Sequence, residues 1–158
     1  MRELINNGAG FQGWLRPHLP RLHELMKAHC SELVARVQKK LAARAVPGVD
    51  DEELGQTIAH LVEQLAAALD RVTRPTQSSS SATDDLTQSA TQQGCQLLHK
   101  GFSLAQVVHY FGDVSTAVAE LAVELQPAVE PHELYALNMC AKEALAAAVS
   151  EYGRLQEQ

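Results

Sequence analysis

Apolar residues recur along most of this chain at intervals of three and four positions, the spacing that places side chains on one face of an α-helix. The first stripe begins after Arg21 and stops before Pro47-Gly48, and the second begins after Asp50. Two further stripes follow Ser103 and Pro131. The four stripes are Leu22, Leu25/Met26, His29/Cys30, Leu33, Val37 and Leu41; Leu54, Ile58, Leu61, Leu65, Leu69 and Val72; Leu104, Val107, Phe111, Val114, Val118, Leu121 and Leu125; and Leu134, Leu137, Ala141, Ala144/Leu145, Ala148, Tyr152 and Leu155.

Capping signals predict where these helices begin and end. Asp50 followed by Glu53 predicts a helix start, with Val49 and Leu54 as a hydrophobic staple. Between the second and third stripes, the sequence predicts another helix from about Asp84 to Lys100.

A sharp corner is predicted after that helix. The sequence His-Lys-Gly at 99–101 places two potential cations in a last turn and glycine at the left-handed cap. Ser103 with Gln106 then predicts a capping box, and Phe102 with Val107 a staple. Of the remaining glycines, Gly112 is interpreted as a site of close helix packing.

The breaks between helices are also visible in the sequence. Pro17 and Pro20 end a weak leading segment around Trp14, and residues 73–83, with Pro75 and four consecutive serines, predict a mobile loop. Pro127 and Pro131 frame the last connection, and Pro131 suits a first-turn position. No terminator follows the last helix, so we expect it to continue toward a further domain or to fray.

The composition agrees with an all-α fold. Apolar residues make up 46% of the 158 residues and aromatic residues only 4%, which disfavours a β-sandwich and excludes a disordered chain. We therefore predict one domain over 1–158, an antiparallel helical bundle or globin-like packing of about five helices.

The net charge of −6 is unevenly distributed along the chain. Residues 1–44 contain eight Lys/Arg and three Asp/Glu, a balance of +5, which leaves five against sixteen, or −11, for residues 45–158. The two parts either attract each other, within the fold or across a dimer, or the basic first helix binds an acidic partner. The overall negative charge argues against a nucleic-acid partner.

The sequence favours a cytoplasmic location. The three cysteines are far apart and form no C-x-x-C motif, which suits a reducing compartment. No apolar run has the length of a signal peptide core or a transmembrane helix, so no membrane association is expected.

The candidate ligand residues are few. Cys95 and His99 are four positions apart on one helix face and provide half of a possible metal site, to which His29-Cys30 would add the rest. His109 is the candidate axial ligand for haem, although it lies outside the stripe of its helix. In the alternative interpretation, these cysteine and histidine residues are ordinary packing residues. No spacing among them matches a known zinc motif, which favours this alternative. We predict no bound metal or cofactor.

Signatures of catalysis are absent. There is no nucleophile elbow, no phosphate-binding glycine loop and no pair of carboxylates placed for acid–base chemistry, so we predict that the protein is not an enzyme. Phosphotransfer domains are also small helical bundles, but the sequence His99-Lys100-Gly101 has their residues at the wrong spacing.

The segment GFSLAQVVHYFGDV at 101–114, with AVAELAVE at 117–124 and LNMCAKEALAAAVSEY at 137–152, resembles the N-terminal helical sensor domain of a group of bacterial sensor histidine kinases. That domain is related to the N-terminal domain of stressosome co-antagonist proteins of the RsbR/RsbRD type. The resemblance covers about residues 87–153. It departs from the family pattern where Gln93-Gly94 stands for a His-Gly pair and Phe111-Gly112 for a Tyr-Gly pair.

The resemblance implies an all-helical, globin-like domain without haem that forms homodimers ahead of a signalling output domain or partner protein. Its signal-related candidates here are Cys95, His99, His109 and Phe111. The alternatives are a helical sensor that carries haem, a metal or a small apolar molecule, and a phosphotransfer protein. Residues that form either the dimer surface or the core are Val107, Phe111, Val114, Val118, Leu121, Ala141, Leu145, Ala148 and Tyr152.

Overall fold

In the computed structural model, the described residues are 21–44, 46, 48, 50–74, 83–125 and 130–156, and they are all-helical. Several predicted features lie outside them: the segment around Trp14 with its two prolines, Pro47, Val49, most of the serine-rich loop, and Pro127. The helices are α2 (Leu22–Ala28), α3 (Cys30–Ala43), α4 (Asp51–Thr73), α6 (Asp84–His99), α7 (Leu104–Glu124) and α8 (Pro131–Gln156).

The predicted first helix is in fact two helices, so the expectation of a single element from Arg21 onward is wrong. His29 separates α2 from α3 with φ −113° and ψ 26°, although neither proline nor glycine is present there. The helical hydrogen bonds continue across the break, from the N–H of His29 to Leu25 and from the N–H of Leu33 to His29. Tertiary packing explains the bend, because α2 packs mainly on α4 while α3 packs on both α4 and α7.

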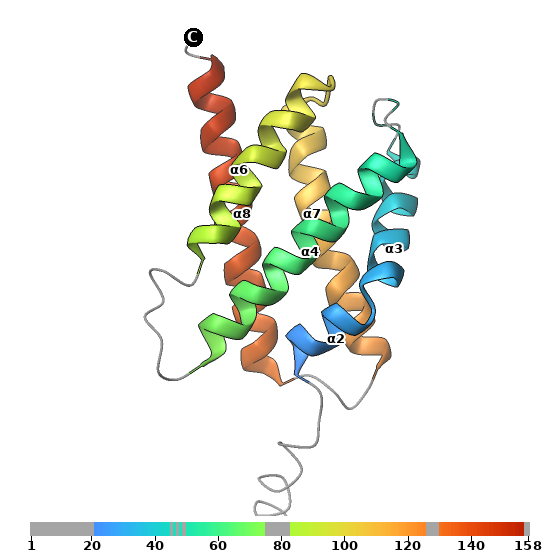
Figure 1. Ribbon diagram of the computed structural model, residues 1–158, viewed down its shortest axis with the longest axis vertical. Coiled ribbons are helices and arrows are strands. Elements are labelled where there is room, and N and C mark those ends of the chain that lie inside the picture. The colour runs from blue at the N-terminus through green and yellow to red at the C-terminus, as the bar shows by residue number, and fades with distance from the viewer. Residues whose placement is uncertain are drawn as a thin grey trace, which may run out of the picture.

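The helices pack at oblique angles rather than as a simple up-and-down bundle. α6 and α8 make the most extensive helix pair, and they run in the same direction, with α7 antiparallel to both (Figure 1). α4 lies obliquely across this group and contacts α2, α3, α6 and α8. Within the described residues, no helix combines the length and the apolar character needed to cross a membrane.

One continuous hydrophobic core lies between these helices, and small residues let α6 and α8 approach closely. A Cβ atom added at Gly94 of α6 would lie 3.0 Å from the Cβ of Ala148 and 3.3 Å from its Cα. Gly112 behaves differently: nothing lies within 4 Å of an added Cβ, so the interpretation of this glycine as a close-packing site is wrong. The side of α7 that carries Gly112 faces away from the neighbouring helices.

The corner between α6 and α7 is closed by two complete capping motifs. Gly101 has φ 98°, and the N–H groups of Gly101 and Phe102 donate to Leu98 and Leu97 at 3.0 Å, the Schellman pattern. Ser103 then forms the predicted capping box: its Oγ accepts the Gln106 N–H at 3.1 Å, and the Gln106 side chain accepts the Ser103 N–H at 2.7 Å. By contrast, Asp50 precedes α4 as predicted but makes no side-chain cap hydrogen bond.

Part of the charge asymmetry is paired within the fold. Four basic side chains of the first 44 residues contact acidic side chains of α7 and α8. The pairs are Arg36–Glu124 at 3.0 Å, Lys40–Glu120 at 3.1 Å, Arg44–Asp113 at 2.8 Å and Arg21–Glu133 at 3.5 Å. The buried Glu133 carboxylate also accepts the backbone N–H of Leu22 at 3.3 Å, which caps the start of α2.

Candidate functional site

The candidate ligand residues do not converge on one site. His99 and His109 are exposed, on α6 and α7, whereas Cys95 is half-buried and Phe111 is fully within the core. Among the residues that the structure describes, no group of three His, Cys, Asp or Glu side chains is arranged to hold a metal ion.

The apolar stripe of α7 faces the interior. Val107, Phe111, Val114, Val118 and Leu121 are all buried. On α8, Ala148 is buried, while Ala141, Leu145 and Tyr152 are half-buried along one edge of the helix. Because a buried stripe is already covered by its own chain, a second copy would have to use a different face.

A buried pair of polar side chains, Gln93 and Tyr110, links α6 to α7. The Tyr110 hydroxyl, fully buried, donates to the Gln93 carboxamide oxygen at 3.0 Å, and the Gln93 amide reaches the Thr57 carbonyl at 3.4 Å. Burial raises the pKa of the Tyr110 hydroxyl far above its ordinary value, so Tyr110 remains a neutral donor. The ring of Phe111 packs edge-on against Tyr110, with ring centroids 5.1 Å apart. This arrangement fixes the register of α6 against α7.

The other titratable groups with shifted pKa values are buried or form contacts between structural elements. Burial raises the pKa of the Cys140 thiol to about 11, and it also raises the pKa of the Cys30 thiol. Hydrogen bonding from Arg74 lowers the pKa of the Asp70 carboxyl, helped by the nearby His23 and Lys27. The His23 Nε2 lies 3.4 Å from the same carboxylate, which joins α2 to α4. None of these groups is a nucleophile with an activating base.

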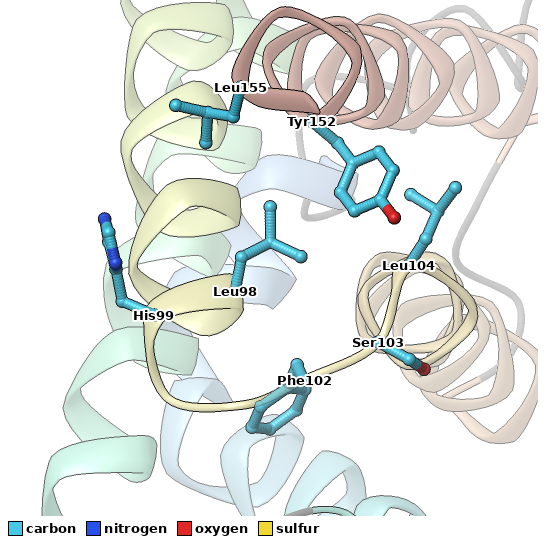
Figure 2. Close-up of a pocket in the computed structure, with 7 residues that line it drawn as sticks. All are labelled: Leu98, His99, Phe102, Ser103, Leu104, Tyr152 and Leu155. Atoms are coloured by element: carbon cyan, nitrogen blue, oxygen red, sulfur yellow. The ribbon is translucent and has the colours of Figure 1, made fainter. Parts of the chain in front are cut away.

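A pocket of about 360 Å³ lies beside the corner between α6 and α7. It is bounded by the end of α6, the start of α7 and the last turns of α8 (Figure 2). The residues that line it are Leu98, His99, Phe102, Ser103, Leu104, Tyr152 and Leu155. Two predicted residues, His99 and Tyr152, thus meet at one place, although Figure 2 shows the imidazole turned away from the space that the Tyr152 ring enters.

The lining of this corner pocket contains no Asp, Glu, Lys or Arg, and the His99 imidazole lies at its rim. Leu98 points into the pocket, and the Tyr152 ring points toward Leu104, which lies beside the Tyr152 hydroxyl (Figure 2). Within the described residues, that hydroxyl makes no hydrogen bond to protein. The Ser103 Oγ accepts a backbone N–H, so its own proton is available to a further acceptor. Such a lining suits an apolar group with one polar atom.

A second feature is the solvent-facing side of α7, taken together with two exposed residues of α8; these residues are here called the outer face. On α7 it comprises Val108, Gly112, Ser115, Thr116, Ala119 and Val123, which at about 100° per residue fall within about a third of the helix circumference. On α8 it comprises Tyr135 and Met139. All four large hydrophobic side chains that are exposed in the described part of the chain belong to it: Val108 (36%), Val123 (65%), Tyr135 (68%) and Met139 (38%).

A groove of about 540 Å³ crosses the outer face on α7. Ser115, Thr116, Ala119 and Val123 line it, with Glu120 and Glu124 at its edge. Those two carboxylates are engaged by Arg36 and Lys40 on the side toward α3. The charged edge of α7 therefore belongs to the α3 contact, and its apolar part is left facing solvent.

The sequence predicts the corner between α6 and α7, but it predicts neither the corner pocket nor the outer face. The pocket combines residues about fifty positions apart, and only the fold brings Tyr152 to Leu104. The outer face had a visible signal, because residues 105–123 of α7 alternate between an apolar stripe and small uncharged residues, with few charges on either side.

Comparison with known proteins finds no match: no protein-family model, no curated protein and no solved structure is significantly similar to this chain. The resemblance to kinase sensor domains therefore stays a prediction, and function must be argued from the two surfaces.

Proposed function

We propose that this domain is a non-catalytic regulatory module that forms a homodimer through its outer face and passes a signal through α8. The proposal includes a cytoplasmic location and a bacterial signalling protein of the two-component or stressosome type, as the resemblance implies. The observation that carries it is the concentration of all four exposed large hydrophobics of the described residues on α7 and α8.

The character of the outer face favours a helical partner over a polar one. Its α7 part contains no Asp, Glu, Lys or Arg between Val108 and Thr116 on the solvent side, and His109 lies at its margin. Gly112 and Ala119 present little bulk, and nothing lies within 4 Å of a Cβ added at Gly112, so another helix can approach the backbone closely. Exposed apolar side chains gathered on two helices are a feature of interaction sites.

A second copy of this chain is the occupant that the charge distribution favours. The chain carries a net charge of −6, so two copies repel each other unless they meet where neither is acidic. The outer face meets this condition, because Glu120 and Glu124 are paired with Arg36 and Lys40 at its edge. A twofold interface uses the same patch on both copies, which suits a patch without charge.

α8 is the element suited to transmit a change at this interface. It packs on both α6 and α7, and it contributes Tyr135 and Met139 to the outer face near its start and Tyr152 to the corner pocket near its end. A shift of α7 against the partner would displace α8 along its length, since packed helices slide as units.

The test is the molecular mass in solution, measured by light scattering across a concentration series. Wild-type protein is expected to reach the mass of a dimer, and the double variant Val108→Lys/Met139→Lys to remain a monomer, because four lysines would be placed at the twofold interface. The matched control is Ala35→Lys/Gln92→Lys, which adds the same charge on the exposed sides of α3 and α6.

Three results would contradict the proposal. They are a wild-type monomer at high concentration, a Val108→Lys/Met139→Lys variant that stays dimeric, and a control variant that loses the dimer equally. Circular dichroism of each variant verifies that it is folded, so a change in mass is attributable to the surface.

A further inference from the structure

We propose that the corner pocket binds a small uncharged molecule with an apolar body and one hydrogen-bonding oxygen, and that binding fastens the end of α8 to the corner. Only the role of this binding in signalling rests on the proposed function. The binding itself follows from the geometry and chemistry of the pocket.

The pocket has one fixed wall and one adjustable wall. Its fixed wall is the corner, where Gly101 adopts φ 98° within the Schellman motif and Ser103 is held by the capping box with Gln106. Its other wall consists of Tyr152 and Leu155 in the last turns of α8, both of them half-buried. A ligand in this space would contact the capped corner on one side and the last described turns of α8 on the other.

The residues that line the pocket disfavour a charged ligand. Leu98, Leu104 and Leu155 supply aliphatic surface, and no carboxylate, ammonium or guanidinium group is among the lining residues. A charged ligand would lose its hydration without gaining a counter-charge. A volume of about 360 Å³ lies at the small end of ligand sites, which implies a molecule no larger than a substituted ring.

The Tyr152 hydroxyl supplies the polar contact. It has no hydrogen-bond partner among the described residues, and Figure 2 shows its ring directed into the pocket between Leu98 and Leu104. A phenolic hydroxyl both donates and accepts, so it pairs with an alcohol, phenol or carbonyl oxygen. The ligand would therefore bury its apolar part against the leucines while its oxygen satisfies Tyr152.

We would test binding by methyl NMR of the full chain, with leucine methyl groups labelled, using three probes of similar shape. p-Cresol has a ring and a hydroxyl, toluene lacks the hydroxyl, and 4-methylbenzoate is charged. We expect saturable shifts at the methyl groups of Leu98, Leu104 and Leu155 with p-cresol. Toluene should bind about 2- to 10-fold more weakly, the value of one hydrogen bond. 4-Methylbenzoate should produce no saturable shift at those methyl groups.

The variant Tyr152→Phe isolates the hydroxyl, and Ser150→Ala is its control, because it removes an exposed hydroxyl of the same helix that lies outside the pocket. Tyr152→Phe should reduce the affinity for p-cresol to that for toluene and leave toluene binding unchanged, which also verifies that the pocket is intact. Ser150→Ala should leave both affinities unchanged. Hydrogen exchange of amides 151–156 should slow when p-cresol is bound to the wild type.

Several outcomes would overturn the inference: no saturable shift at the three leucines, equal affinity for p-cresol in wild type and Tyr152→Phe, loss of toluene binding in Tyr152→Phe, tight binding of 4-methylbenzoate, or unchanged exchange of amides 151–156. None of these bears on the homodimer, which is read from the molecular mass without any probe. Conversely, a monomeric protein that binds p-cresol at these residues would refute the proposed dimer and leave the pocket assignment standing.

Discussion

Replacing Gly94 with alanine is expected to destabilise the protein, although alanine is the better helix former. Gly94 lies in the middle of α6, and a Cβ there would be 3.0 Å from the Cβ of Ala148 and 3.3 Å from its Cα. Neither atom can move independently of the α8 backbone. The added methyl group therefore has to push α6 and α8, the most extensive helix pair in the fold, apart by several tenths of an ångström.

The magnitude follows from two opposing effects. Alanine in place of glycine stabilises a helix interior by about 1 kcal/mol, while inserting a methyl group into a close-packed contact costs about 1–3 kcal/mol. The net expected change for Gly94→Ala is a loss of about 1 kcal/mol in the free energy of unfolding, with an upper limit of about 2 kcal/mol. At Gly112, where nothing lies within 4 Å of the new atom, only the helix-forming effect remains, so Gly112→Ala should gain about 1 kcal/mol.

Urea denaturation of dilute protein measures the stability of both variants, and the readout is a shift of the denaturation midpoint at constant slope. The pair Gly94→Ala and Ala148→Gly provides the decisive test, because the second substitution removes the atom with which the first collides. The double variant should be more stable than the sum of the two single effects implies. If Gly94→Ala is as stabilising as Gly112→Ala, or if the two substitutions are additive, the close contact does not limit this position.

Two further predictions concern polar groups. Tyr110→Phe should cost about 1–2 kcal/mol in urea denaturation, because it leaves the buried Gln93 oxygen without its donor. Tyr110→Phe/Gln93→Leu should recover most of that loss, and a double variant no more stable than Tyr110→Phe would contradict the reasoning. Asp70, whose pKa is lowered mainly by Arg74, should stabilise the fold above the ordinary carboxyl pKa and lose that effect as the pH falls through its lowered value. Asp70→Asn should therefore flatten the stability profile measured by thermal melting between about pH 5 and pH 2, and an unchanged profile would refute this.

The elements that could be predicted best are those with local causes. The corner at 99–106 follows from glycine at a position that needs positive φ and from a serine and glutamine three residues apart, and the structure has both motifs. The starts of α4, α7 and α8 were also predicted, since proline and capping residues act within one turn. Asp50 shows that the start of a helix can be predicted without its cap: α4 starts after Asp50, yet the Asp50 side chain makes no cap hydrogen bond.

Features with non-local causes could not be predicted. Nothing in the sequence near His29 breaks a helix, and α2 separates from α3 because the two segments pack on different neighbours. Gly94 and Gly112 are equally single glycines inside helices, but only the first faces another backbone. The corner pocket likewise depends on Tyr152 returning beside Leu104 after the chain has passed through two helices.

α7 is the case in which the sequence permitted two opposite interpretations of one helix. Its heptad stripe suited either a core or a dimer surface, and the structure buries all of it. The ion pairs to α3 show which remaining side is free: Asp113, Glu120 and Glu124 point toward α3, so the uncharged residues from Val108 to Val123 are left for solvent. A solvated helix normally keeps its charges on the outside. In α7 these carboxylates are used in ion pairs within the chain, and the side left to solvent is uncharged, which is why we propose that the homodimer forms there.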